Sequence, residues 1–486
     1  MPDKKNILFL MTDQHRRDYV GYDPGSVLET PNLDRLAGSV GFTDCTTVNP
    51  ICTPARTALL TGKYSHQVGT LSMSGDLSRQ HPTYLRALQK AGYWTAAVGK
   101  LHWLQGWAWD TPRGQGHDLV GMKEEMKEFG LNYLWESSGK QLAVKNHCDY
   151  CAHLDEKGLL EDYRDWIESC SHNAHCAGEE ELTGQPWPFA EEDYVDVVTG
   201  DRMVEAIRNR PADRPFMLFG SFCCPHPPYD PPASYLEAVP PEEEDFWEPF
   251  EQEWPPHIPE HLKRARRAYK AMINLVDRQV GRVLQTLEEE GILEDTVILF
   301  TSDHGEQLGD LGHGGKQDPW PGSVSVPCAI RHPDHLDDRL VGSPVEITDL
   351  TATILDVAGL DPQEVLVRDW PAFHDRVPCR SLMPLVRGEA DRVRDYAFSE
   401  CEGRWQLVRD GEWTYVRELD YEEPGGAGEH LYNRAADPGC RNNLIDDPDH
   451  SEVARRFRDR RQFVMDRTPP AQIRWAPLIS DPGFEP

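Results

Sequence analysis

The stretch Cys52-Thr53-Pro54-Ala55-Arg56 places a cysteine and an arginine four residues apart at an expected helix start. Thr53 suits the N-cap, and Pro54 suits the first helical position, where its missing N–H would have no partner anyway. The Cys52 side chain would then face the N-terminal end of the helix, where backbone N–H groups attract an anion. Arg56 adds a fixed positive charge one turn further on. A cysteine before a helix is most often merely buried, but this pattern also suits a nucleophile beside an anion site.

Polar side chains follow four apolar runs that are typical of strands buried on both faces. The runs cover 6–11, 94–98, 215–222 and 296–301, and the polar residues after them are Asp13 and Gln14, Lys100 and His102, His226, and Asp303 and His304. A doubly wound sheet opens the carboxyl ends of its parallel strands into one crevice. Each cluster is a weak signal by itself. Together they predict a single pocket that also contains Cys52 and Arg56.

The Cys-x-Pro-x-Arg pattern, followed by Leu-Leu-Thr-Gly at 59–62, resembles the active-site signature of the sulfatase family. These are formylglycine-dependent type I sulfatases of the alkaline-phosphatase-like superfamily, in which a separate formylglycine-generating enzyme oxidises the cysteine. Three further motifs match: Gly-Lys-x-His at 99–102, Pro-His-x-Pro at 225–228 and Asp-His-Gly-Glu at 303–306. The resemblance covers most of the chain and implies that Cys52 becomes formylglycine.

The resemblance implies a divalent metal held by Asp13, Gln14, Asp303 and His304 together with the modified residue at position 52. The family usually has a second aspartate after the first, whereas here Gln14 offers a neutral carbonyl oxygen. Ca²⁺ is the expected ion because the ligands are rich in oxygen. The neutral Gln14 and the nitrogen ligand His304 leave Mn²⁺ as the alternative.

The resemblance also assigns roles around the substrate. It implies that the catalytic residues are Cys52, Arg56, Lys100, His102, His226 and Lys316, and that the substrate-binding residues are Lys100, His226 and Lys316, to which we add the nearby His313. One hydroxyl of the formylglycine hydrate would attack sulfur and expel the alcohol. The second hydroxyl, deprotonated with help from His102, would then expel sulfate. Arg56 and Lys100 would stabilise the developing charge.

Hydrolysis of a sulfate monoester on an aryl or carbohydrate alcohol is the function that these motifs favour. The expected partner is a small sulfated substrate, and no motif identifies its alcohol part. The alternative is a phosphonate monoester or phosphodiester hydrolase on the same scaffold, since the Asp-Gln and Asp-His pairs also suit that chemistry. A third hypothesis, a catalytically silent binding protein, is disfavoured because every motif keeps its charged residues.

The elements that must position these residues indicate an α/β fold, in which helices sandwich a large and mostly parallel sheet. Helices are predicted over 30–37, 82–91, 191–209, 262–290 and 347–359, in addition to the one that follows Cys52. We expect a catalytic domain over 1–377, with a loop-rich insertion at about 105–190. A smaller C-terminal subdomain over 378–486 is expected to contain an antiparallel sheet, signalled by the Asp410-Gly411 turn, and a helix over 451–467.

Four cysteines in the expected insertion, Cys148, Cys151, Cys170 and Cys176, could bind a structural zinc ion. A Cys-x2-Cys pair followed by two more cysteines can supply four tetrahedral ligands. The second pair has a gap of five residues, which is wider than usual, and the sulfatase resemblance does not require such a site. Free thiols or a disulfide are therefore the favoured alternatives.

The chain has 486 residues and a net charge of −32, which argues against nucleic acid and anionic membranes as partners. An anionic substrate stays compatible, because a local basic pocket can override the global charge. The sequence lacks the roughly 18 consecutive apolar residues of a transmembrane helix, and the run at 7–11 is too short for a signal peptide. We therefore expect a cytoplasmic chain with cysteines that are mostly reduced. A homo-oligomer is left open.

Overall fold

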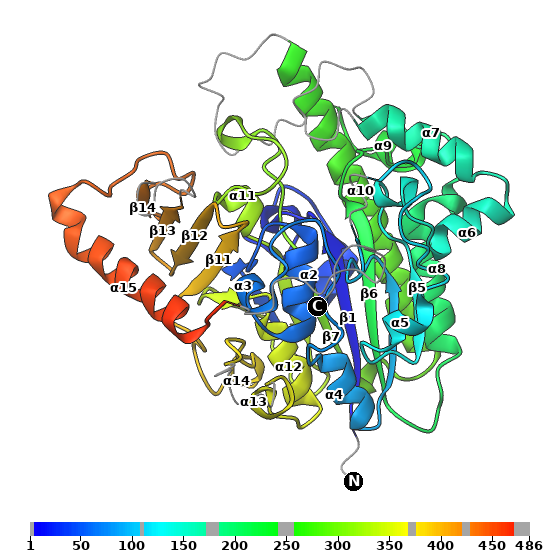
Figure 1. Cartoon of the computed structure of the whole chain (residues 1–486), viewed down its shortest axis with the longest axis horizontal. Helices are drawn as coiled ribbons and strands as arrows, with labels where there is room; N and C mark the ends of the chain where they lie inside the picture. The colour runs from blue at the N-terminus through cyan, green and yellow to red at the C-terminus, as the bar shows by residue number, and fades with distance from the viewer. Residues whose placement is uncertain are drawn as a thin grey trace, which may run out of the picture.

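A sheet of eight strands runs through the molecule in the order β5-β4-β6-β1-β7-β8-β2-β9 (Figure 1). The strands are β1 (Asn6–Asp13), β2 (Val40–Phe42), β4 (Trp94–Gly99), β5 (Tyr133–Glu136), β6 (Phe216–Pro225), β7 (Thr296–Ser302), β8 (Cys328–Arg331) and β9 (Arg339–Val341). This computed structural model describes residues 4–106, 111–171, 184–241, 257–367, 376–419 and 428–470.

The four predicted apolar runs form the centre of this sheet as β4, β6, β1 and β7. Neighbouring strands among them are parallel, and in β1 Leu8 lies level with Leu218 of β6 on one side and Ile298 of β7 on the other. All three side chains are fully buried. Burial on both faces explains why these strands are continuously apolar rather than alternating. Their parallel direction brings all four carboxyl ends to one edge of the sheet.

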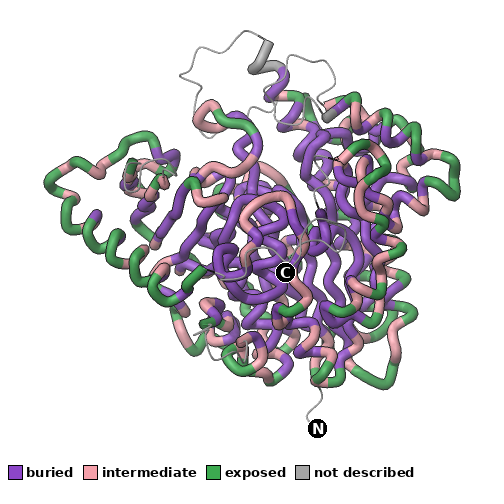
Figure 2. The backbone as a smooth tube through the Cα atoms, viewed as in Figure 1, coloured by how far each residue is buried: buried purple, intermediate pink, exposed green. Residues whose placement is uncertain are grey.

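Helices cover both faces of the sheet, as the sequence predicts (Figure 1). One face carries α8 (Val195–Arg208) and α10 (His257–Glu289), and the other carries α2 (Cys52–Thr61), α4 (Tyr84–Lys90) and α12 (Asp349–Val357). The apolar stripe of α10 is buried along its length, for example at Val276 and Val283. Figure 2 shows the buried residues concentrated in the sheet and in the inner faces of these helices.

The region at 105–190 is more regular than the loop-rich insertion that the sequence suggests. It contains α5 (Lys123–Lys127), β5, α6 (Asp149–Glu156) and α7 (Leu160–Ser171). β5 pairs in parallel with β4 and forms one edge of the sheet. These elements are short, and β5 has only four residues, so each leaves too little periodicity in the sequence to stand out. Residues 107–110 and 172–183 of this region lie outside the described residues.

A separate antiparallel sheet of four strands, in the order β11-β12-β13-β14, confirms the predicted C-terminal hairpin. Its strands are β11 (Ala397–Cys401), β12 (Trp405–Arg409), β13 (Trp413–Glu418) and β14 (Glu429–Asn433). The helix α15 (Ser451–Arg467) covers one side of this sheet with buried Phe457 and Val464, and its outer face is exposed (Figures 1 and 2). A short parallel pair, β3 (Cys45–Thr46) with β10 (Val345–Glu346), lies beside β11.

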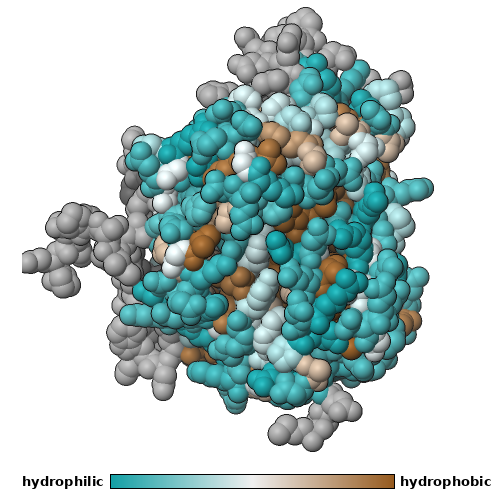
Figure 3. Space-filling view, turned by 90° about the vertical axis from the view of Figure 1, so that its right-hand side faces the viewer, coloured by the Kyte–Doolittle hydropathy of each residue, from teal (hydrophilic) through white to brown (hydrophobic). Residues whose placement is uncertain are grey.

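The outer surface on the side of the large sheet's helices is mostly hydrophilic, with hydrophobic residues in small scattered groups (Figure 3). Scattered apolar side chains are normal on protein surfaces and need no partner. Among the described residues, the helices include none whose length and apolar character would let it cross a membrane.

One buried ionic network joins α12 to the C-terminal sheet. Arg394, just before β11, donates from Nε to Asp349 Oδ2 at 2.9 Å and lies 2.7 Å from Glu346 Oε1 through Nη1. Asp349 begins α12 and also accepts the backbone N–H of Arg380 at 2.8 Å. Burial raises the pKa of Glu346 to about 7 although Arg394 favours its charged form. The guanidinium therefore compensates two carboxyl groups that have no access to water.

Replacing Arg394 with methionine should lower the free energy of unfolding by about 3–5 kcal/mol, because two buried carboxyl groups lose their counter-charge. Urea denaturation followed by circular dichroism measures this change. Arg392 provides the matched control, since its side chain is 70% exposed and its contact with Asp395 is 3.5 Å long. Arg392→Met should shift stability by less than about 0.5 kcal/mol. Equal stability of the two variants would contradict the assigned role of Arg394.

Candidate active site

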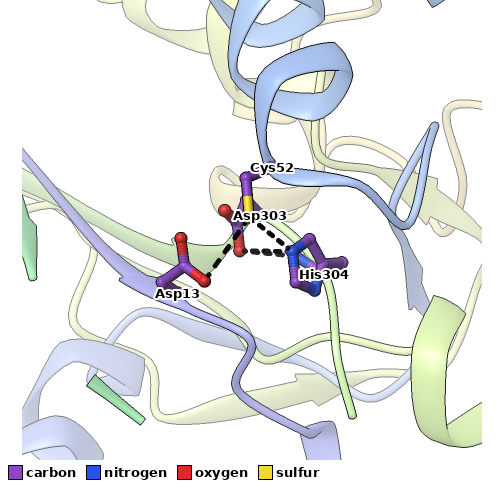
Figure 4. Close-up of side chains that lie close together, drawn as sticks. All are labelled: Asp13, Cys52, Asp303 and His304. Atoms are coloured by element: carbon purple, nitrogen blue, oxygen red, sulfur yellow. Dashed lines mark hydrogen bonds and ion pairs between the residues drawn. The ribbon is translucent and has the colours of Figure 1, made fainter. Parts of the chain in front are cut away.

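The carboxyl ends of β1 and β7 meet the N-terminal end of α2 in one buried cluster (Figure 4). The cluster consists of Asp13, Cys52, Asp303 and His304, and one ligand atom from each lies within 4.8 Å of the others. Cys52 Sγ is 3.1 Å from His304 Nε2 and 3.7 Å from Asp13 Oδ1. Residues that are far apart in the sequence thus meet as the strand-end pattern predicts. Within the described parts of the chain, this is the one such group of metal-ligating side chains found.

The start of α2 differs from the prediction by two residues. Ile51 is the N-cap with extended backbone angles, so Cys52 is itself the first helical residue. Thr53 is not the cap, because its hydroxyl donates instead to the side chain of Gln105. Pro54 still lies in the first turn, where it needs no N–H partner. Cys52 therefore lies within the first turn of the helix instead of before it, and the Cys52 side chain is fully buried.

Arg56 connects the two carboxylates of the cluster. Its Nη2 donates to Asp13 Oδ2 and its Nε donates to Asp303 Oδ2, both at 2.8 Å. Its Nη1 donates to Ser221 Oγ on β6, also at 2.8 Å. The guanidinium is thereby fixed to three neighbouring strands. It neutralises one of two buried negative charges that would otherwise repel each other.

Two lysines approach Cys52 from different loops. Lys316 Nζ is 2.8 Å from Cys52 Sγ and 3.2 Å from His304 Nε2. Lys100 Nζ is 4.0 Å from the same sulfur and 2.8 Å from Asp13 Oδ2. Burial by itself would raise the pKa of Asp13, but the positive charges of Lys100 and Arg56 hold this pKa well below its usual range. The pocket around the sulfur is therefore locally cationic in a strongly acidic chain, which suits an anionic substrate.

Gln14 and Glu306 form a contact that the sequence analysis missed. The Gln14 side-chain amide Nε2 donates to Glu306 Oε2, and the backbone N–H of Gln14 donates to Asp303 Oδ1 at 3.0 Å. Glu306 Oε1 also accepts the backbone N–H groups of Leu308, at 3.1 Å, and Gly315, next to Lys316. One buried carboxylate therefore orients Gln14 and holds the loop that carries Lys316. The Asp-His-Gly-Glu motif contains this residue, but nothing in its spacing indicates the contact with Gln14.

His304 has a defined orientation. Its Nδ1 lies 2.9 Å from the carbonyl oxygen of Gly305, so Nδ1 carries the proton and Nε2 is left as the unprotonated nitrogen in the cluster. Burial lowers the pKa of His304 to about 4, which keeps the ring neutral at physiological pH. A neutral imidazole with one nitrogen fixed by a carbonyl is the usual form of a histidine metal ligand.

His102 and His226 are held by backbone carbonyls in the same way. His102 Nε2 donates to the Ser138 carbonyl at 3.0 Å, and its Nδ1 is buried with no hydrogen-bond partner. His226 Nδ1 donates to the Pro227 carbonyl at 2.6 Å, and its Nε2 is 4.0 Å from Asp13 Oδ1. Burial is the main cause that lowers the pKa of both rings well below the usual value, and the positive charge of nearby Lys100 lowers it further. Each histidine thus presents one defined nitrogen for proton transfer.

The loop that carries His226 is fixed from two sides. Asp196 of α8 accepts the backbone N–H groups of Cys223, at 2.8 Å, and Cys224, at 2.6 Å. The buried Lys140 donates to the Pro228 carbonyl at 2.9 Å and to Asp230 Oδ1 at 2.7 Å. The insertion and α8 thereby fix the end of β6 and the histidine that directly follows it.

His313 and the candidate zinc cysteines lie apart from this cluster. His313 Nδ1 is 3.2 Å from Asp318 Oδ2, and its side chain is 47% exposed. Cys148 Sγ is 3.4 Å from Cys151 Sγ, whereas Cys170 has its own contact with Ser169 Oγ at 3.9 Å. Cys176 lies outside the described residues. The zinc site therefore stays a prediction.

The residues at the cluster fit a divalent cation. Asp13 and Asp303 offer carboxylate oxygens, and His304 offers Nε2. Gln14 Oε1 is buried with no hydrogen-bond partner, which is unusual for an amide oxygen and suits a fourth ligand. Three oxygen donors and one nitrogen match the preferences of Ca²⁺ and Mn²⁺.

Comparisons with known proteins agree with this geometry. The Sulfatase family model matches residues 5–360. The chain is 27% identical over 483 residues to an arylsulfatase of Clostridium perfringens (strain 13 / Type A), covering 92% of each protein. It is 29% identical over 483 residues to a choline-sulfatase of Rhizobium meliloti (strain 1021), covering 92% of this chain and 83% of that protein.

Solved structures show the same fold. A phosphonate monoester hydrolase of Agrobacterium radiobacter superposes with a TM-score of 0.75 at 22% sequence identity, and the match covers 96% of each chain. A sulfatase-fold protein of Bacteroides fragilis, described as the putative sulfatase yidJ, superposes with a TM-score of 0.73 at 19% identity, covering 96% of this chain and 97% of that one. Because the family model extends over nearly three quarters of its length, the chain belongs to the sulfatase family.

Proposed function

We propose that this protein hydrolyses sulfate monoesters, with the residue at position 52 as the nucleophile after conversion of Cys52 to formylglycine. The observation that carries the proposal is the buried meeting of Cys52 with Asp13, Asp303 and His304. Two lysines and one arginine surround this point and supply the positive charge that a sulfate group needs. The relatives named arylsulfatase and choline-sulfatase support the same reaction class.

The proposed metal ligands are Asp13, Gln14, Asp303 and His304, together with position 52. Ca²⁺ is the proposed ion and Mn²⁺ the alternative, because three of the four protein donors are oxygens and one is nitrogen. When bound, such an ion neutralises negative charge on the sulfate and orients the nucleophile. Arg56 keeps both carboxylates in place from the side by binding the Oδ2 atom of each.

Conversion of Cys52 to formylglycine by a separate generating enzyme would provide an aldehyde hydrate as the nucleophile. Lys316 and Lys100 would bind sulfate oxygens and stabilise charge that develops on them, since both ammonium groups point at the position of the sulfur atom. Lys316 would assist departure of the leaving alcohol oxygen, and His226 would contact the ester group through Nε2, the ring nitrogen that its bond to the Pro227 carbonyl leaves unprotonated. His102 would accept a proton at Nδ1, the atom that its bond to Ser138 leaves unpaired.

A second candidate is hydrolysis of phosphonate monoesters or phosphodiesters at the same site. It is favoured by the neutral ligands Gln14 and His304, which leave the metal with only two formally negative side chains, Asp13 and Asp303. A less neutralised ion would bind a phosphorus centre with developing negative charge more strongly. Rates on a 4-nitrophenyl sulfate and on the matching phenylphosphonate monoester compare the two functions directly. A higher kcat/KM for the phosphonate would overturn the sulfatase assignment.

The conversion of Cys52 can be read from the tryptic peptide that covers residues 36–56. We expect mass spectrometry to show an aldehyde at position 52 in protein produced together with a formylglycine-generating enzyme. Cys45 lies in the same peptide and is the internal control, because iodoacetamide should alkylate Cys45 but not the converted residue. Cys52→Ala should lower kcat by at least about a thousandfold. A fully active protein with an intact thiol at position 52 would contradict the proposed nucleophile.

Replacing Glu306 with glutamine should weaken metal binding. The new side-chain NH2 group would face N–H groups that Glu306 accepts, such as the Gln14 amide, so Gln14 would lose its fixed orientation. The expected loss of Ca²⁺ affinity is about 10–100-fold, the range for a residue that orients a ligand. Isothermal titration calorimetry on metal-free protein measures it without relying on turnover.

The exposed Glu294, whose side chain is 69% exposed and contacts Arg331, is the control for the loss of one negative charge. Glu294→Gln should leave Ca²⁺ affinity unchanged. If Glu306→Gln binds Ca²⁺ as tightly as Glu294→Gln, then Glu306 does not orient the metal ligand Gln14.

A further inference from the structure

A groove with a volume of about 1000 Å³ lies between α15 and the segment 376–396. Tyr64, which lines it, follows the C-terminal end of α2, whereas Cys52 begins that helix. A helix of ten residues is roughly 15 Å long, so the groove is a different place from the active site. Seven arginines but only three acidic residues line it. This local excess of positive charge contrasts with the net charge of −32 for the whole chain.

Four of the seven arginines already have acidic partners inside the protein. These pairs are Arg394 with Asp349 and Glu346, Arg455 with Glu452 and Asp459, and Arg456 and Arg460 with Asp410. The other three, Arg376, Arg380 and Arg467, are exposed and form no ion pair with any described residue. Arg380 uses one nitrogen to bind the Val393 carbonyl at 2.6 Å, which fixes its direction. Arginines without an acidic partner among the described residues are unexpected in a chain with 82 acidic and 50 basic residues.

The groove also offers apolar surface beside these charges. Phe463 is 50% exposed, and the guanidinium of Arg467 lies over its ring at 4.5 Å. Val464 and Tyr396 extend the apolar part of the wall. A ligand that fits must therefore present negative groups to arginine side chains and a less polar ring face to Phe463. Arginine is the side chain best suited to bind planar or tetrahedral oxyanions with two parallel hydrogen bonds.

We propose that this groove binds a sulfated carbohydrate at a second site, through Arg376, Arg380 and Arg467. A sugar chain carries sulfate groups at separate points along an otherwise neutral backbone, which matches three arginines around an apolar wall. A nucleic acid fits less well, because its closely spaced phosphates need many positive contacts and the chain as a whole carries a net charge of −32. The choice of a sulfated sugar rests on the proposed sulfatase function, whereas binding in the groove does not require turnover.

The test is isothermal titration with short dextran sulfate, using the variant Arg376→Ser/Arg380→Ser/Arg467→Ser. The control variant Arg202→Ser/Arg208→Ser/Arg214→Ser removes the same charge from three arginines elsewhere, each paired with one acidic side chain. We expect the groove variant to bind at least about tenfold more weakly than the wild type and the control variant to bind normally. The KM for sulfated oligosaccharides should rise in the groove variant, while kcat and the KM for a small aryl sulfate stay unchanged.

Equal binding by the two variants would overturn the proposal. Unsulfated dextran of the same length should not bind. If it does bind, then the arginines do not recognise the ligand through its sulfate groups, and the proposal is wrong. If inorganic sulfate or phosphate binds the groove as tightly as dextran sulfate, the groove is a site for free anions instead. If a single-stranded oligonucleotide binds more tightly than dextran sulfate, the ligand is a nucleic acid and not a carbohydrate. A lack of sulfatase activity with intact groove binding would contradict the proposed function and not this second site.

Discussion

The contact of Arg56 with Asp13 and Asp303 is the constraint on which the site depends. Parallel strands bring the two carboxylates together at one edge of the sheet, where they are fully buried and would repel each other. A single guanidinium binds one oxygen of each and leaves their other oxygens directed to the cluster around Cys52. Because Arg56 follows Cys52 by one helical turn, the same helix start supplies the proposed nucleophile position and the compensating charge.

The sequence was sufficient to predict which residues meet, because parallel strands align their carboxyl ends. Asp13, Lys100, His226 and Asp303 were each identified from an apolar run followed by polar residues, and the structure places all four around position 52. It could not predict Glu306 as the residue that orients Gln14, since that contact depends on how a loop folds back. The partners of the Glu306 side chain can therefore be identified only from the three-dimensional structure.

The fold was predictable to the same extent. Long buried strands such as β1 and β6, and the amphipathic α10, have strong periodicities that single sequences reveal. The edge strand β5 and the pairing of β3 with β10 involve only two to four residues each, and their stability comes from neighbours instead of local preference. Thr53 shows the same limit at a single residue, because its hydroxyl prefers the side chain of Gln105 to a capping position.

The complete burial of Cys52 limits when the proposed conversion of its thiol could take place. A modifying enzyme needs access to the thiol, but in the folded protein the side chain is enclosed and contacts His304, which follows it by 252 residues. At a translation rate of roughly 5–20 residues per second, a ribosome needs on the order of 10–50 s to synthesise that interval. During this interval the nascent chain lacks β7, so the sheet cannot close over the thiol. Synthesis itself would thus open a window for the proposed conversion, and the completed fold would end it.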